Sequence, residues 1–170
     1  MSKTATYSLI ASTTISGTST ITFTFSSIPQ TFTDLVLICD AKASNGAAIG
    51  ISPNSATGTF SGTYLYGNGT SAASNRRSNA TSSLLYIGYN FNLTSSNGGN
   101  CIAHFMDYAN TTTYKTVLSR YNVPASGTEA GVSLWQNTAA ITSLSIVCND
   151  PYYWLAGSTF KLYGIQAGSI

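Results

Sequence analysis

The chain is short of charge. Of its 170 residues only 12 are charged, seven Lys or Arg and five Asp or Glu, and histidine occurs once. A typical soluble domain carries about a quarter charged residues. Ser and Thr, 49 residues together, and 11 tyrosines supply polarity instead, so hydroxyl and amide groups are expected to cover the surface. Such a surface is typical of a subunit of a larger assembly, because the centres of interfaces are poor in charge.

The small number of charges also limits the partners. Arg76 and Arg77 are the only adjacent basic pair, and no basic stripe follows the chain as binding to a phosphate backbone requires. No apolar run reaches the roughly 18 residues of a membrane-spanning helix, and no N-terminal signal peptide is recognised. We therefore expect no nucleic-acid partner and no membrane span, and a chain that stays in the cytoplasm until it is assembled.

The chain has few of the titratable groups that catalysis needs. His104 and Asp107 lie three residues apart, a spacing that places them on opposite faces of one strand. Asp34 and Asp40 share a face but stand about 20 Å apart at the rise of a strand, too far for a glycosidase pair. No Gly-x-Ser-x-Gly motif and no metal-ligand spacing is present. The sequence predicts no enzyme activity, no metal and no cofactor.

Cysteine is also scarce. Cys39, Cys101 and Cys148 are far apart, and each lies inside an apolar stretch without a Cys-x-x-Cys motif. We expect reduced, buried side chains. A pairing such as Cys39 with Cys148 remains the alternative.

Strand signals recur about every 8 to 12 residues, which is typical of an all-β sandwich or barrel. Ile21, Phe23 and Phe25 alternate with threonine, and Leu35–Cys39 is continuously apolar, which predicts a central strand covered on both faces. No stretch has helical periodicity. We expect one antiparallel all-β domain over residues 1–170, with about ten strands and little or no helix. The expected strands are Thr6–Ala11, Ile21–Phe25, Leu35–Cys39, Ala47–Ser52, Thr63–Tyr66, Leu84–Tyr89, Cys101–Tyr108, Lys115–Arg120, Ala130–Trp135, Ile141–Cys148 and Thr159–Ile165.

Two segments have no single interpretation. The polar stretch Gly67–Ser83 fits either a long surface loop or strands that face a neighbour. Tyr152, Tyr153 and Trp154 follow Pro151, and exposed rings are unfavourable unless they meet a partner. These rings fit a sugar-binding platform, an anchor between subunits, or a plug that closes a loop.

Several stretches together carry a resemblance to a known family. They run over most of the chain, and Thr112–Thr116 and Gly157–Ile165 are the most specific. The matching stretches are Ser27–Leu37, Tyr64–Thr70, Asp107–Arg120, Leu134–Trp135, Ala139–Leu144 and Ala156–Ile165. In these stretches the chain resembles a family of small virion proteins of tailed bacteriophages, particularly those of cyanobacteria and marine bacteria.

The resemblance implies a jelly-roll-like β-sandwich on the outside of the virion, without enzymatic activity. The expected role is a capsid decoration, or cement, protein: a homotrimer that is assembled in the host cytoplasm, binds the major capsid protein and stabilises the shell. Tyr152, Tyr153 and Trp154 would then anchor the interface, with Arg76 and Arg77 at its polar rim. The alternative is a tail-fibre or receptor-binding module that recognises host-surface glycans through the aromatic segment.

Overall fold

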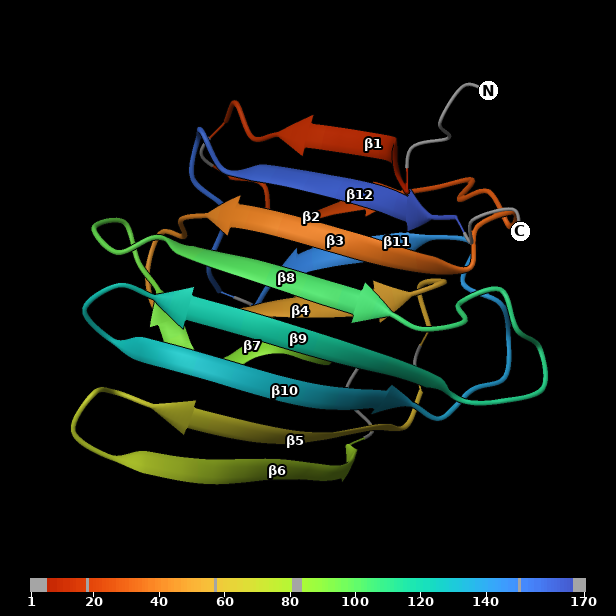
Figure 1. Ribbon diagram of the computed structural model, residues 1–170. Helices are drawn as coiled ribbons and strands as arrows, with labels where there is room; N and C mark the ends of the chain where they lie inside the picture. The colour runs from red at the N-terminus through yellow and green to blue at the C-terminus, as the bar shows by residue number, and fades with distance from the viewer. Residues whose placement is uncertain (1–5, 18, 57, 81–83, 150, 167–170) are drawn as a thin grey trace.

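The molecule is built of β-strands in two facing layers (Figure 1). The computed structural model describes residues 6–17, 19–56, 58–80, 84–149 and 151–166. Within them lie twelve strands, all paired antiparallel, and no residue in a helix. A helix long and apolar enough to cross a membrane is therefore also absent from these residues. The expected all-β sandwich is confirmed.

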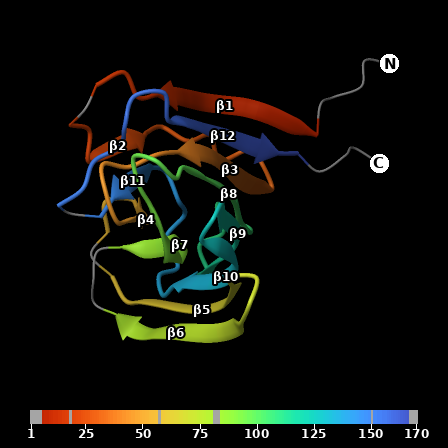
Figure 2. The same cartoon turned by 90° about the vertical axis from the view of Figure 1, so that its left-hand side faces the viewer.

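The two sheets differ in width. In spatial order the larger sheet contains β1 (Tyr7–Thr14), β12 (Thr159–Ile165), β3 (Asp34–Ala41), β8 (Gly99–Phe105), β9 (Lys115–Val123), β10 (Gly127–Trp135), β5 (Phe60–Gly67) and β6 (Ala72–Ala80). The smaller sheet contains β2 (Thr22–Phe25), β11 (Leu144–Cys148), β4 (Ala47–Pro53) and β7 (Leu85–Leu93). The side view shows the smaller sheet on the left, against one face of the larger sheet (Figure 2).

The connections follow the jelly-roll pattern. β1 pairs with β12, β2 with β11, β3 with β8 and β4 with β7, so the chain folds back on itself as one long antiparallel ribbon. The ribbon is rolled so that its strands alternate between the two sheets, as in a double Greek key. Two hairpins, β5–β6 and β9–β10, are inserted into this ribbon and extend the larger sheet to eight strands.

The core lies between the sheets. Alternate residues of the larger sheet face inward and are buried, as in β9, where Val117, Ser119 and Tyr121 alternate with exposed or half-buried residues. Every residue of β4 is buried, which makes it the strand most enclosed by the rest of the chain. An antiparallel strand with one buried and one open face reads as alternating apolar and polar residues, and the sequence shows that alternation in β2, whereas in β9 only the burial alternates.

Two expectations from the sequence need correction. The apolar run Leu35–Cys39 is central in the larger sheet, and its outward side is covered at Val36, which is 2% exposed, but not at Ile38, which is 39% exposed. The stretch Gly67–Ser83 contains strand β6 at the edge of the same sheet, so the loop interpretation is wrong for Ala72–Ala80. Residues 81–83 lie outside the described residues. The sequence left β6 open between strand and loop because its only apolar residues are alanines and none of its residues is β-branched.

The difference between the two faces of β3 can be tested with neighbouring residues. Leu37→Ala is expected to lower the free energy of unfolding by about 2–5 kcal/mol, because it leaves a cavity in the core. Ile38→Ala is expected to cost about 1 kcal/mol or less, because its side chain is already partly in water. Urea unfolding of both variants measures the difference, and equal losses would contradict the open outer side of β3 at Ile38.

Candidate functional site

His104, Asp34 and Asp107 lie close together at one end of the strand pair β3–β8. His104 Nε2 lies 2.9 Å from Asp34 Oδ2, across the pair β3–β8, and Asp34 Oδ1 accepts a hydrogen bond from the backbone N–H of Asp107 at 2.7 Å. Asp34 thus ties β3 to β8 through His104 and to the turn after β8 through Asp107. The contact with Asp34 gives His104 a structural role. Asp150 lies outside the described residues. In the part of the chain that the structure describes, no three metal-binding side chains converge.

Two side chains of the charged residue types, Glu129 and Lys115, are buried in the part of the chain that the structure describes, and both are satisfied by hydrogen bonds. Glu129, 4% exposed, accepts bonds from the backbone N–H groups of Tyr89 and Asn90 and from the Asn90 side chain, at 2.7–3.0 Å. Lys115 Nζ donates to the carbonyls of Thr113 and Thr138, and burial lowers the pKa of Lys115. Carboxylate and ammonium here link separate segments of the chain and are not free for catalysis.

The burial of these two charged residues was not expected from the sequence, although their spacing along the strands indicates it. Glu129 is six residues before Trp135 on β10, and Lys115 is two residues before Val117 on β9. Because side chains on a strand alternate between faces, even spacings place both residues on the inner face.

The aromatic segment is not an exposed anchor as a whole. Trp154 is fully buried, its backbone N–H bonds to the carbonyl of Thr20, and its ring lies edge-on to Phe160 at 5.1 Å between centroids. Trp154 is therefore not exposed on the surface of the single chain, an arrangement that agrees with the plug alternative. Tyr152 and Tyr153 are half-buried. The segment folds inward because β-bridges join Trp154 to Thr20 and to Ala43.

The two arginines expected at a rim point to different sides of β6. Arg77 faces the smaller sheet: its guanidinium lies 4.5 Å from the centroid of the Tyr86 ring, and it donates to the carbonyl of Leu84. Arg76 is exposed and faces away, beside Thr63. The structure thus separates a pair that is adjacent in sequence.

The most distinctive surface is the side of the larger sheet that points away from the smaller sheet, here called the outer face. Six of the nine large apolar side chains that are exposed among the described residues lie on it. They are Tyr7, Leu9, Ile38, Leu65, Leu118 and Val132. Contiguous exposed apolar surface of this extent marks a site of interaction in soluble proteins.

Strand register lines these side chains up in rows across the sheet. One row passes from Ile38 through Ile102, Arg120 and Ala130 to Leu65, on five neighbouring strands. The adjacent row contains Leu118 and Val132 at corresponding positions of β9 and β10. Each row mixes aliphatic and polar side chains, since the first also contains Lys161 beside Ile38, and the second contains His104 and Thr63 beside Leu118 and Val132.

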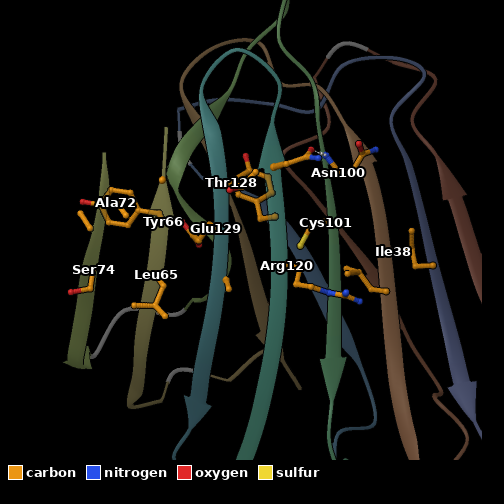
Figure 3. Close-up of a pocket in the computed structure, with 16 residues that line it drawn as sticks. Ile38, Leu65, Tyr66, Ala72, Ser74, Asn100, Cys101, Arg120, Thr128 and Glu129 are labelled. Carbon is orange, nitrogen blue, oxygen red and sulfur yellow. Dashed lines mark hydrogen bonds between the residues drawn. The ribbon is translucent and has the colours of Figure 1, made fainter. Parts of the chain in front are cut away.

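The outer face is also hollowed. A hollow of about 1070 Å³ lies over the central strands and is bordered by Ile38, Leu65, Ile102, Arg120 and Ala130, among others (Figure 3). A second hollow of about 530 Å³ adjoins it and shares Leu65, Ile102, Arg120 and Ala130. A surface with aliphatic floors and few polar groups is suited to receive apolar side chains of a protein.

The three cysteines are free and buried. Cys39 and Cys101 are cross-strand partners on β3 and β8, and Cys148 lies in the smaller sheet. Burial raises the pKa of Cys39 and Cys101, and raises that of Cys148 to about 12. The expected reduced, buried state agrees with this arrangement, and the neighbour of Cys39 is Cys101.

Comparisons with known proteins identify no relative. No protein-family model, no curated protein and no solved structure matches the chain. The case for a function therefore depends on the geometry of the chain and on its sequence.

Glu129→Gln tests the buried carboxylate. The amide replaces one acceptor oxygen by a donor that faces a backbone N–H, so we expect a loss of about 1.5–3 kcal/mol in the free energy of unfolding. The neighbouring variant Thr128→Ala, at an exposed position, should stay within about 0.5 kcal/mol of the parent. A Glu129→Gln protein that is as stable as the parent in urea unfolding would contradict the structural role of Glu129.

The buried thiols predict a labelling pattern. The thiolate is the reactive form, and burial with a raised pKa keeps it scarce, so iodoacetamide at mildly alkaline pH should leave all three cysteines of the folded protein unmodified. After unfolding in guanidinium chloride all three should react. Mass spectrometry measures both states, and an unfolded, unreduced chain that takes up only one label would reveal a disulfide.

Proposed function

We propose that this chain is a structural protein of a tailed-bacteriophage virion, and that it decorates and stabilises the capsid. The observation that carries the proposal is the apolar, hollowed outer face of the larger sheet. Among the described residues, no second layer of the chain covers this face. A surface of this kind becomes stable when it is covered in an assembly.

Three further observations support the proposal. The jelly-roll connections agree with the fold that the phage-protein resemblance implies. Only 12 of 170 residues are charged, as suits a protein whose surface is shared with neighbours. The buried Glu129 and Lys115 are already satisfied by structural hydrogen bonds. The proposed action is adhesion: many copies, each adding a modest contact area, stiffen a shell.

The tail-fibre alternative has less support. It relied on an exposed aromatic platform at Tyr152, Tyr153 and Trp154, and the largest of these rings is buried. Glycan-binding surfaces also use aromatic rings that are open to solvent, whereas the two rings that border the main hollow, Tyr66 and Tyr121, are half-buried and buried. We therefore place the chain on the head of the virion, in contact with the major capsid protein.

Copy number in purified particles tests this role. Densitometry of denatured virions should find hundreds of copies of the chain per particle. A dozen or two would overturn the head location in favour of a fibre or another part of the tail, and absence from the particle would overturn the virion role altogether.

Incorporation should also depend on the outer face. The double variant Leu65→Lys with Leu118→Lys is expected to lower the copy number at least about tenfold, because lysines in an apolar contact lose hydration without a partner. Tyr114→Lys is the matched control, since Tyr114 is 55% exposed but lies in the loop before β9. Full incorporation of the double variant would exclude the outer face from assembly.

A further inference from the structure

The outer face carries one exposed acid, Asp40, and three exposed bases, Arg76, Arg120 and Lys161, whose side chains have no partner among the described residues. Arg120 is the base nearest to the middle of the sheet. Asp40 on β3 and Arg120 on β9 are both exposed, and both belong to the outward-facing positions of their strands. Neither side chain forms a hydrogen bond or an ion pair with any other described residue. The one ion pair among the described residues joins His104 and Asp34. Only β8 separates the two strands.

Apolar side chains surround the arginine. Ile102 and Ala130 are its register partners on β8 and β10, and Arg120 borders both hollows. Figure 3 shows its side chain extended across β8 towards Ile38. An arginine set in aliphatic surface is a frequent centre of binding energy in interfaces, provided that a carboxylate meets it, because a charge buried without a partner is costly.

We propose that the occupant of the outer face is a second copy of this chain, related by a twofold axis. The axis lies in the plane of contact over β8, and Asp40 of each copy meets Arg120 of the other. A rotation of this kind exchanges two points that lie on one face, so a face that carries both charges is complementary to itself. Each symmetric contact then occurs twice, as in other isologous dimers.

The size of the face is sufficient for a stable dimer. A twofold axis over β8 matches the seven strands from β1 to β5, which at about 4.8 Å apart span about 29 Å and are about 25 Å long. The matched area is therefore about 720 Å², near the roughly 800 Å² per partner of a standard interface.

The remaining charges of the face permit this contact. Asp34 is already paired with His104. Arg76 lies on the edge strand β6, where the rim of an interface stays in water. Lys161 lies on β12 as the register partner of Ile38, so its positive charge belongs to the contact, on the same side of β8 as Asp40. The centre of the contact then holds the aliphatic side chains and two Asp40–Arg120 pairs.

This inference rests on the proposed function in one respect, that the outer face is covered in the assembled state. A dimer would present two identical copies of its other surfaces to the shell. Two-point attachment raises the apparent affinity without any new kind of contact.

Charge exchange tests the contact in the purified chain. Analytical ultracentrifugation should show a dimer for the parent protein. Arg120→Glu and Asp40→Lys should each weaken dimerisation at least about tenfold, because each opposes like charges at two places. The double variant restores opposite charges and should return the dissociation constant to within a few-fold of the parent. Arg76→Glu, the same change of charge at an exposed position on β6, should leave dimerisation unchanged.

Three outcomes overturn the proposal: a monomeric parent, a trimer, or a dimer that does not respond to the single charge reversals. Circular dichroism shows whether each variant is folded, and Arg120→Gln replaces the reversal if Arg120→Glu does not fold. A monomer that is still abundant in virions means that a different virion protein covers the face, so the second-copy inference fails while the proposed function stands. If the chain forms a charge-dependent dimer but is absent from particles, the second-copy inference stands and the proposed function fails.

Discussion

Burial of apolar side chains between two sheets of unequal width is the interaction on which the rest of this structure depends. The inner faces of the eight-stranded and four-stranded sheets supply the core, and one rolled antiparallel ribbon brings them together. Because the interior excludes water, each polar group that enters it needs a partner. The three hydrogen bonds to Glu129 and the two from Lys115 meet this requirement, and they also join strands to the segments that lie beside them.

The same arrangement explains the unusual outer face. The two inserted hairpins widen the larger sheet, while its outward side receives no second layer from the described residues. In most one-sided antiparallel sheets the outward positions are polar. Here several are aliphatic, as at Ile38, Leu65 and Leu118, and charges are few. Hydroxyl-rich strands keep the chain hydrated, and the aliphatic side chains provide the adhesive surface that an assembled particle would bury.

Much of the strand pattern could be predicted from sequence, and the failures have physical causes. β2 shows period-two alternation, and both β2 and β9 were expected close to where they lie. β6 was left open because an edge strand with one weakly covered face needs little apolar character. The burial of Trp154 depends on contacts with Thr20 and Ala43, more than a hundred residues away in the chain, and no local pattern reports such contacts. His104 and Asp34 meet for the same reason, through the pairing of β3 with β8.

The sequence by itself determined the fold class, the shortage of catalytic groups and the polar but weakly charged surface, because composition and short-range periodicity carry those properties. The tertiary structure alone decided which side of each apolar strand is covered. Leu35–Cys39 illustrates the difference: its letters are apolar throughout, yet Leu37 enters the core and Ile38 faces solvent. The reason is that alternation fixes only that neighbouring side chains point to opposite faces, whereas the presence of a second layer depends on strands that are distant in the chain.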